Sequence, residues 1–452
     1  MKEKNHFILS EGDVNHSHSR NEWQNSYLND QTKQILKDDK RYFLHQSLST
    51  PCLNVVSECE GIFLTDEQGR DIMDFHGNAV HQVGYRNPAV IKAMKDALDL
   101  LPFSPRRYTN KWAVQLAKEL TSLTENQLSK VLFAPGATSA IGMALKLARL
   151  ATGKHKVISM WDSFHGASLD AISIGGERLF RKGLEPLLPG TIHVPSIDSY
   201  RPLWEGHSGD PIQLVKYIEY TIEKDGEVGA IVMETIRNTD VQIPPKVFYQ
   251  ELRRVCDRHG VLLILDETPI GLGRTGKMFA YEHYDIIPDI VVLGKGLGGG
   301  VFPLAAMLAK EELDIASETA LGHYTHEKSP VGAAASSAVI SYLKDNNLLE
   351  RTAYLEQLLN KRLNELKEKY VQIGDIRGIG LLFAVELVKD RTSKERAYEE
   401  ADQIMYACLK KGLSFKVSKG NVIQLCPPLT ITEEELEKAI QILDDSFAEV
   451  IQ

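Results

Sequence analysis

Short runs of apolar, mostly β-branched residues alternate with helical stretches between about residues 75 and 330. A helical stretch, TSAIGMALKLARLATG (138–153), separates the first two of these runs. Such punctuation is typical of βαβ units, in which each helix carries the chain back so that the next strand runs parallel to the last. The strand candidates are KVLFA (130–134), KVISM (156–160), GAIVMET (229–235), GVLLILDE (260–267) and DIVVLGK (289–295). The pattern predicts an α/β fold with a mostly parallel sheet between helices.

The segments on either side of this region have different patterns. Residues 1–40 are polar, and we expect a frayed N-terminal leader there. Residues 41–74 contain two strand patterns around a turn at Asp66–Gly69. Residues 331–452 contain long amphipathic helices, two short strands and a last helix with Thr432 as its N-cap. We therefore predict a large domain at 75–330 and a smaller α+β domain that combines 41–74 with 331–452.

Charge and cysteine content make several classes of function improbable. The net charge of −9 provides no overall attraction to nucleic acid or to an anionic membrane. No run approaches the roughly 18 uninterrupted apolar residues of a membrane helix. The five cysteines are scattered, without a CxxC pair or a histidine at zinc-ligand spacing, so we expect reduced thiols and no metal site. The expected location is the cytoplasm, and the expected partner is a small molecule.

Polar residues that follow the strands are the first candidates for a site, because ligands of open α/β sheets bind beyond the carboxyl ends of the strands. The first strand candidate is followed by the turn Pro135-Gly136-Ala137-Thr138-Ser139 and then by a helix. A small turn at a helix N-terminus presents free N–H groups and a positive dipole, which suits a phosphate. A simple N-cap by Thr138 or Ser139 is the alternative at this position.

A nucleotide-hydrolase alternative rests on the segment from Gly271 to Lys277, which matches GxxxxGK. A phosphate-binding loop of that kind needs a strand before it, a helix after it, and serine or threonine next to the lysine. Met278 follows the lysine, and no helical pattern begins there. The acidic strand end at Asp266 also precedes the segment, in the wrong order for this class. The sequence therefore disfavours a nucleotide hydrolase.

Lys295 is unusual because glycines flank it directly after an apolar strand candidate. We expect this lysine to be desolvated, with a lowered pKa that would let it attack a carbonyl group as a neutral amine. The glycines would leave room for a bulky group to approach the backbone. Asp266 ends a neighbouring strand candidate. Together with the 136–138 turn, these residues meet the needs of pyridoxal phosphate: a Schiff base, a partner for the pyridine nitrogen and a phosphate site.

At this point the chain resembles the class III aminotransferases, which are fold-type I enzymes that depend on pyridoxal phosphate. The resemblance extends from about residue 45 to 450 and rests on a specific series of motifs in order. They are VLFAPGATSAIGMALKLAR, SMWDSFHGASLDA, GAIVMET followed by IPP, LLILDETPIGLGRTGKMFAYEH, PDIVVLGKGLGGG, GHYTHEKSPVGAAA, DIRGIGLLFAVEL and LCPPLTIT.

The resemblance implies a role for each matching residue. Lys295 would form the Schiff base and move the proton, and Asp266 would keep the pyridine nitrogen protonated. Phe164 would stack on the cofactor ring. Gly136, Ala137 and Thr138 would bind the phosphate, joined by Thr325 from a second subunit. The family therefore implies a homodimer with an active site shared between its subunits.

Several residues depart from the family pattern. Pro269 stands where the family often has a glutamine that reaches the cofactor's phenolic oxygen, and Thr138 replaces a glutamate. Glu234 matches a glutamate that often partners an arginine, here Arg377, which often grips a carboxylate. Arg237 is an extra cation, and together with Arg106 and Arg107 it suggests a substrate with a doubly charged group such as a phosphonate. The alternative is that Arg106 and Arg107 form inter-subunit salt bridges. The candidate substrate-binding residues are Arg237, Arg377, Tyr108, Asn78, Arg107 and Glu234.

Within the family, four segments resemble the ammonia-lyases that act on (R)-1-hydroxy-2-aminoethylphosphonate: FLHQSLSTPCLNV, DFHGNAVHQVGY, LPFSPRRYTN and GHYTHEK. This resemblance implies a lyase that converts this small amine to phosphonoacetaldehyde and ammonia. The main alternative is an ω-aminotransferase that passes the amino group to a keto acid. A third hypothesis is a binding protein without cofactor on an old enzyme scaffold, which would lack the visible absorbance of a protein-bound Schiff base.

Overall fold

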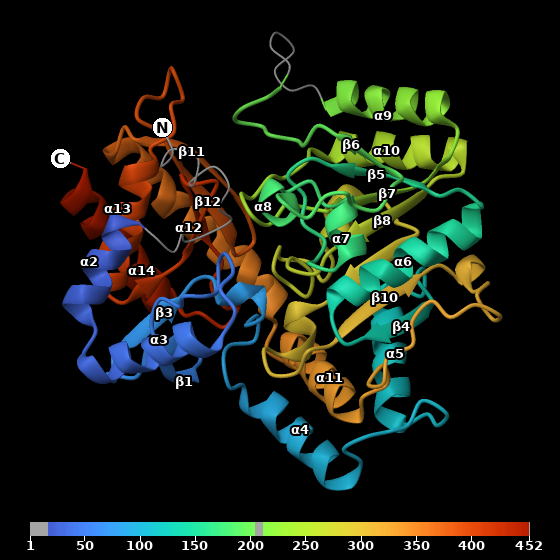
Figure 1. The fold of residues 1–452 in the computed structure, drawn as a ribbon, viewed down its shortest axis with the longest axis horizontal. Coiled ribbons are helices and arrows are strands. Elements are labelled where there is room, and N and C mark those ends of the chain that lie inside the picture. Colours follow the sequence, from blue (N-terminus) through green and yellow to red (C-terminus); the bar gives the residue numbers. More distant parts are fainter. Residues whose placement is uncertain (1–16, 204–210, 452) are drawn as a thin grey trace.

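The computed structural model describes residues 17–203 and 211–451, which form two units side by side (Figure 1). One unit is built on a seven-stranded sheet from the middle of the chain. The other combines the two ends of the chain around two smaller sheets. None of the helices in these described ranges is long and apolar enough to cross a membrane.

The large unit is an α/β structure with the strand order β4-β10-β9-β8-β7-β5-β6. β5 to β9 are joined by parallel pairings, and only β10 runs antiparallel to its neighbours. The mostly parallel sheet between helices is therefore confirmed. Its strands are β4 (Lys130–Ala134), β5 (Lys156–Met160), β6 (Thr191–Val194), β7 (Val228–Glu234), β8 (Leu262–Asp266), β9 (Ile290–Leu293) and β10 (Ala305–Ala309).

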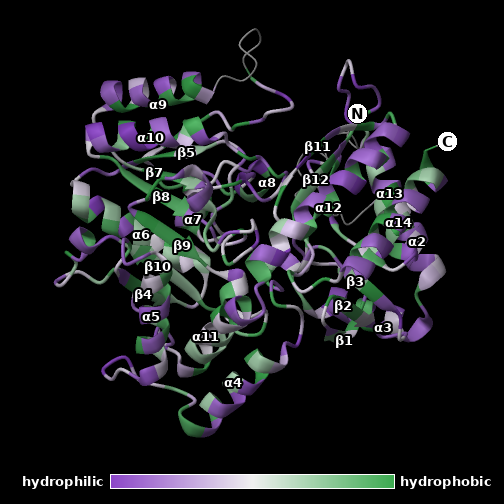
Figure 2. Ribbon diagram, turned by 180° about the vertical axis from the view of Figure 1, so that it is seen from behind, coloured by the Kyte–Doolittle hydropathy of each residue, from purple (hydrophilic) through white to green (hydrophobic). Residues whose placement is uncertain are grey.

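Both faces of this sheet are buried. Alternate residues of each strand point to opposite faces, so each strand contributes side chains to two cores. Along β7, Ile231 and Met233 pack in the core that includes α10, whereas Val232 packs in the core that includes α6. Figure 2 shows continuous hydrophobic colour along β7, β8 and β9. The helices of this part of the chain are α4 (Pro88–Leu100), α5 (Lys111–Leu123), α6 (Ala137–Thr152), α7 (Leu169–Ile174), α8 (Arg178–Arg181), α9 (Pro211–Asp225) and α10 (Lys246–His259).

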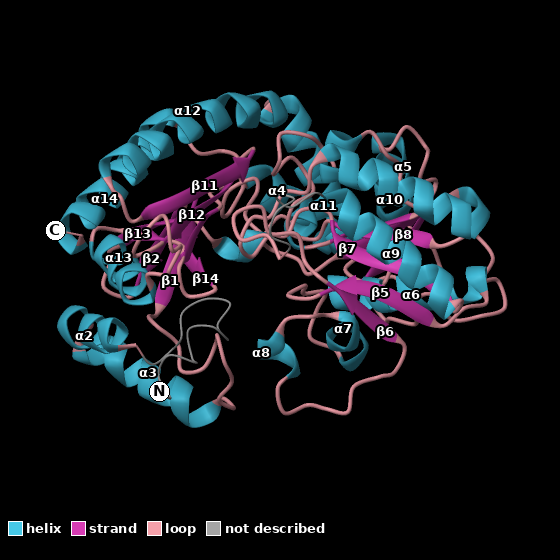
Figure 3. Cartoon of the chain, turned by 90° about the horizontal axis from the view of Figure 1, so that it is seen from above, coloured by secondary structure: helices cyan, strands magenta, loops and turns pink. Residues whose placement is uncertain are grey.

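The small unit joins the chain ends through hydrogen bonds between strands. β13, near the C-terminus, pairs in parallel with β3, near the N-terminus, in the sheet β1-β2-β3-β13. The sheet β11-β12-β15-β14 is antiparallel, and α12 arches over it (Figure 3). The strands are β1 (Val56–Glu60), β2 (Phe63–Asp66), β3 (Asp71–Asp74), β11 (Ile373–Ile379), β12 (Leu382–Leu387), β13 (Leu413–Ser414), β14 (Lys416–Ser418) and β15 (Val422–Leu425). The helices of the small unit after the large sheet are α12 (Leu348–Lys369), α13 (Tyr398–Lys410) and α14 (Glu433–Val450), and α11 (Pro330–Asp345) precedes them in the chain.

Thr432 caps α14 as expected, with its hydroxyl accepting from the Glu435 N–H in a capping box. α11 packs on α4, α5 and the Lys295–Gly298 turn. The helix thus extends the large unit past the expected boundary at residue 330. The division of the chain into domains otherwise stays a prediction.

The expectation of a frayed leader is wrong for residues 17–40. Helices α2 (His18–Tyr27) and α3 (Asp30–Tyr42) are capped by the side chains of Ser17 and Asn29. Trp23 of α2 is buried and packs with Tyr406 of α13. The polar composition of residues 1–40 conceals this helix, because one large aromatic residue, Trp23, is enough to anchor it to α13. Residues 1–16 lie outside the described ranges.

Candidate active site

A pocket of about 600 Å³ lies beyond the carboxyl ends of the central strands. Its wall includes Glu234 from the end of β7, Asp266 from the end of β8, and Lys295, which follows β9. These strands are neighbours in the sheet, and β7 and β8 pair so that Glu234 stands opposite Asp266. The parallel arrangement therefore brings three ionisable side chains from distant segments into one cavity.

Lys295 begins a short 3-10 turn, Lys295–Gly298, with a left-handed backbone φ of 45°. Its side chain is exposed in this chain, so the expected desolvation is not found. The flanking glycines also serve a different purpose from the expected one. A Cβ at Gly296 would lie 1.8 Å from Gln82 Oε1, and a Cβ at Gly294 would lie 3.0 Å from the Ala137 Cβ. Close protein neighbours therefore require these glycines.

Asp266 is held by a partner that sequence reasoning missed. His165 Nδ1 lies 2.9 Å from Asp266 Oδ2, and the Thr268 N–H donates to Oδ1 over 3.0 Å. Burial raises the pKa of Asp266, but the hydrogen bonds from His165 and Thr268 outweigh burial and lower it overall. The carboxylate therefore stays ionised and can accept a bond from a protonated ring nitrogen. The Phe-His-Gly triplet was the only sequence signal for His165.

The turn Gly136–Thr138 leads into α6, and no side chain caps this helix. The alternative of a simple N-cap by Thr138 or Ser139 is therefore excluded. The Thr138 hydroxyl instead accepts from the Ala167 N–H over 3.3 Å. Residues 136–138 all line the pocket. A helix N-terminus without a side-chain cap, open to a cavity, is a suitable place for a phosphate.

Phe164 lines the same pocket, and its ring centroid lies 4.3 Å from that of Phe180. Its backbone N–H donates to Glu234 Oε1 over 3.1 Å. The other oxygen, Glu234 Oε2, accepts from the Asn238 N–H over 3.2 Å. Glu234 therefore does not pair with Arg377 in this structure, in contrast to the pairing that the family pattern suggested.

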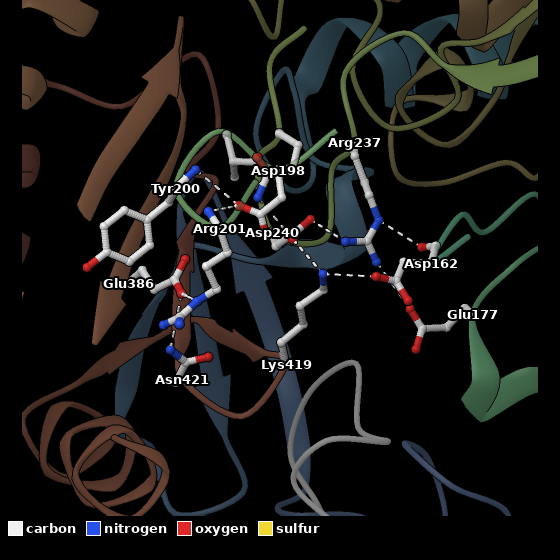
Figure 4. Close-up of polar contacts among 12 residues, drawn as sticks. Asp162, Glu177, Asp198, Tyr200, Arg201, Arg237, Asp240, Glu386, Lys419 and Asn421 are labelled. Carbon is white, nitrogen blue, oxygen red and sulfur yellow. Dashed lines mark hydrogen bonds and ion pairs between the residues drawn. The ribbon is translucent and has the colours of Figure 1, made fainter. Parts of the chain in front are cut away.

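Arg237 is buried in an ion cluster (Figure 4) and does not line this pocket. Its guanidinium forms ion pairs with Asp240 and with Glu177, the latter over 3.1 Å, and donates to the Asp162 carbonyl over 2.8 Å. Burial lowers the pKa of Arg237, but the charge of Asp240 and its neighbours raises it overall. The side chain is therefore already used to neutralise protein carboxylates, and the substrate contact at Arg237 stays a prediction.

Arg377 is held in a similar way. Its guanidinium pairs with Asp375 over 2.8 Å and with Glu386 over 3.0 Å, and it donates to the Asp240 carbonyl over 2.7 Å. The side chain is largely buried and is absent from the pocket wall. Each edge of the guanidinium thus has a protein acceptor. Its expected role as a carboxylate grip is therefore not supported by this conformation either.

The remaining candidates lie outside the pocket wall of this chain. Asn78, Arg107, Tyr108 and Thr325 are not among the residues that line it. Asn78, Tyr108 and Thr325 are exposed. Val80, two residues after Asn78, does reach the pocket. The roles of these four residues stay predictions.

The model of the family "Aminotransferase class-III" matches residues 45–447.

The chain belongs to the class III aminotransferase family.

Its relatives within the family have different named activities. An (R)-1-hydroxy-2-aminoethylphosphonate ammonia-lyase from Vibrio splendidus strain 12B01 is 50% identical over 456 residues, covering 98% of this chain and 95% of the relative. A leucine/methionine racemase from Thermococcus litoralis is 34% identical over 427 residues, covering 92% of this chain and 96% of the relative. Family membership alone therefore leaves the reaction open.

Solved structures of class III enzymes share the fold. The taurine:2-oxoglutarate aminotransferase from Bifidobacterium kashiwanohense, in complex with pyridoxal phosphate and glutamate, superimposes with a TM-score of 0.86 at 26% identity, covering 93% of this chain and 98% of that one. The fold-type I class expected from the sequence is confirmed. The family and this structure imply pyridoxal phosphate as the cofactor.

The residues of the pocket fit that cofactor. The uncapped N-terminus of α6 suits the phosphate, the ionised Asp266 suits a protonated ring nitrogen, and Phe164 provides a flat apolar surface. The Thr268 hydroxyl is buried without a hydrogen-bond partner among the described residues, so it is a polar atom that a ligand could satisfy. Pro269 lines the pocket next to it and offers no side-chain donor.

Gly166→Ala should damage the phosphate turn. The φ of Gly166 is +123°, and a Cβ there would lie 1.8 Å from Thr138 Oγ1. We expect a loss of about 1–3 kcal/mol in the free energy of unfolding from backbone strain, together with weaker binding of pyridoxal phosphate because Thr138 must move. Thermal denaturation and cofactor titration measure the two effects.

Gly153→Ala is the matched control for this variant. Gly153 also has a positive φ, +66°, but nothing lies within 4 Å of its would-be Cβ. It should lose stability without losing cofactor affinity. Equal cofactor affinity in the two variants would contradict the role of Thr138.

Proposed function

We propose that this chain is a pyridoxal-phosphate-dependent ammonia-lyase that converts (R)-1-hydroxy-2-aminoethylphosphonate to phosphonoacetaldehyde and ammonia. The half-identical relative from Vibrio splendidus supports the substrate. The same relative carries the choice of lyase over aminotransferase, because it is 50% identical over 98% of this chain and is named an ammonia-lyase.

The proposal assigns the cofactor-facing residues as follows. Gly136, Ala137 and Thr138 hold the phosphate, Phe164 stacks on the ring, and Asp266 accepts from the ring nitrogen. Thr325 completes the phosphate site from the second subunit of a homodimer. The bound cofactor supplies an electron sink that stabilises negative charge on the carbon next to the substrate nitrogen.

Lys295 carries out the proton transfer in this proposal. Its Nζ removes a proton from the carbon that bears the amino group. The hydroxyl group on the adjacent carbon then leaves, and the released enamine is hydrolysed by water to the aldehyde and ammonia. Asn78, Arg107 and Tyr108 remain candidates for contacts with the substrate at the entrance to the pocket, and Glu234 is the candidate inside it.

The decisive assay omits keto acids. Purified protein loaded with pyridoxal phosphate should release one ammonia and one aldehyde for each hydroxylated aminophosphonate, without pyruvate or 2-oxoglutarate and without forming an amino acid. 2-Aminoethylphosphonate, which lacks the hydroxyl group, is the matched control and should release no ammonia. Strict dependence on a keto acid would instead establish the ω-aminotransferase alternative.

The location of the protein is proposed to be the cytoplasm, in line with the family. Size-exclusion chromatography with light scattering would test the homodimer, and a mixed dimer would test sharing of the site. Subunits that carry only Lys295→Ala, combined with subunits that carry only Thr325→Ala, should assemble one intact and one doubly damaged site in each dimer.

A further inference from the structure

Glu234 is an ionisable group in the pocket that the steps above leave unused. It ends β7 directly beside Asp266 of β8, and it lines the cavity together with Lys295. Its carboxyl group is fixed at both oxygens by backbone donors. The Phe164 N–H bonds to Oε1 over 3.1 Å, and the Asn238 N–H bonds to Oε2 over 3.2 Å. The group is therefore held in place without a mobile partner.

No salt bridge within the described parts of the chain includes Glu234. The arginine that the family pattern would pair with it, Arg377, is engaged by Asp375, Glu386 and the Asp240 carbonyl instead. Arg237, three residues along the chain, is paired with Asp240 and Glu177. Because neither Arg377 nor Arg237 contacts Glu234 directly, the carboxyl group of Glu234 can hold a proton.

The charged groups around Glu234 act in both directions. Burial raises its pKa most strongly, and the negative charge of Asp266 raises it further. The positive field of Arg237, His165 and the bond from the Phe164 N–H lower it, but they do not outweigh burial. Tyr249, whose hydroxyl donates to the Glu234 carbonyl, stays neutral because burial raises its pKa. Lys295 faces the same cavity. The overall direction is upward, which favours the protonated acid.

We propose that Glu234 is the general acid that protonates the leaving hydroxyl group of the substrate. This inference rests on the proposed lyase function and adds a second catalytic residue to it. Hydroxide is a poor leaving group, so breaking the carbon–oxygen bond needs a proton donor in the pocket. Glu234 is a fixed carboxyl group of the cavity, and none of the ion pairs in residues 17–203 and 211–451 includes it.

The step balances in atoms and electrons. Lys295 Nζ takes the proton from the carbon that bears nitrogen, and the electron pair of that C–H bond becomes the new carbon–carbon double bond. The electron pair of the C–O bond leaves with the oxygen, which takes the Glu234 proton and departs as water. Hydrolysis of the enamine consumes one water, so one substrate gives one aldehyde and one ammonia. The proton on Lys295 returns to Glu234 through solvent before the next turnover.

The test compares two leaving groups in Glu234→Gln. Glutamine keeps the shape of the side chain, but its single amide oxygen can accept only one of the two backbone bonds, and it cannot act as an acid. With the hydroxylated aminophosphonate, kcat should fall about 10²–10⁴-fold, the usual contribution of a general acid. With 2-amino-1-fluoroethylphosphonate, which expels fluoride without needing protonation, the loss should be far smaller. Equal losses for the two substrates would overturn the proposal.

Glu267→Gln is the matched control. Glu267 is also a buried carboxyl group that accepts from backbone N–H groups, those of Ala280 and Tyr281, but it does not line the pocket. Any loss in this variant should be equal for the two leaving groups. A leaving-group effect of the same size in Glu267→Gln would show that the preference is indirect, and the assignment to Glu234 would fail.

Two further measurements test the protonation of Glu234: the pH dependence of kcat and the infrared spectrum. As pH rises through the elevated pKa of Glu234, the acid loses its proton and kcat should fall; this alkaline limb should be absent in Glu234→Gln. The infrared band of a protonated carboxyl group should also disappear in the cofactor-free variant.

If the wild-type protein releases no ammonia without a keto acid, the lyase function itself fails. If it does release ammonia but the leaving-group difference is missing, only the role of Glu234 fails.

Discussion

Lys295→Ala is expected to reduce ammonia release by about 10⁴-fold, the upper range for loss of a general base. Alanine has no amine, so it can neither bond covalently to the cofactor nor take the proton from the substrate. The visible absorbance of the loaded wild-type protein should also be shifted to that of a free aldehyde. Rapid ammonia assays and absorbance spectra measure the two effects.

Lys92→Ala serves as the control for this variant. Lys92 lies on the exposed face of α4 and pairs with Asp96, also an exposed residue. Surface pairs of this kind contribute roughly 0–1 kcal/mol to stability. Both activity and spectrum should therefore be retained. A Lys295→Ala protein that still releases ammonia at the wild-type rate would remove Lys295 from the mechanism. Absence of the visible absorbance band from the wild-type protein would instead favour the hypothesis of a binding protein without cofactor.

Asp266→Asn is expected to weaken cofactor binding and to lower kcat by about 10²–10⁴-fold. Asparagine preserves the size of the side chain and can still accept from the Thr268 N–H. It removes the charge that pairs with His165 and with a protonated ring nitrogen. Loss of one partner from a buried charged pair costs on the order of 3–5 kcal/mol, and each 1.36 kcal/mol is tenfold in rate.

Asp289→Asn separates this chemical effect from simple instability. Asp289 is likewise buried and ion-paired, with Arg253 and Lys310, but it precedes β9, at the strand end opposite Lys295. We expect this variant to lower the melting temperature and leave the dissociation constant for pyridoxal phosphate unchanged. If Asp266→Asn binds the cofactor as tightly as wild type, the assigned role of Asp266 is wrong.

The strands of the large sheet show where sequence reasoning succeeds. β4 and β5 lie where their apolar runs predicted them, and β7, β8 and β9 are within two residues of prediction. β10 was missed, because its sequence AAMLA consists of good helix formers. The short edge strand β6, TIHV, was missed because half of its residues are polar. In β10, where all five residues are buried, burial on both faces overrides the weak strand propensity.

The candidate site also contains residues that the sequence located and contacts that it did not reveal. Lys295 and Asp266 follow their strands directly in the sequence, so an apolar run and its next residue were enough to place them at one edge of a parallel sheet. The partners of the two arginines were not foreseeable. Arg377 donates to a carbonyl 137 residues away, and His165 reaches Asp266 across 101 residues. No local periodicity encodes contacts of that separation.

The sequence by itself therefore determined the fold class, the family and the order of the residues proposed to face the cofactor. These properties depend on local patterns and on covalent neighbours. Only the tertiary structure decided which charges remain available to a substrate. Arg237 and Arg377 are neutralised by Asp240, Glu177, Asp375 and Glu386, whereas Glu234 has no such partner among the described residues. Whether a charged side chain is neutralised depends on which distant segments of the chain pack against it. Burial makes an unpaired charge costly, so a buried arginine needs carboxylates or carbonyls from those segments.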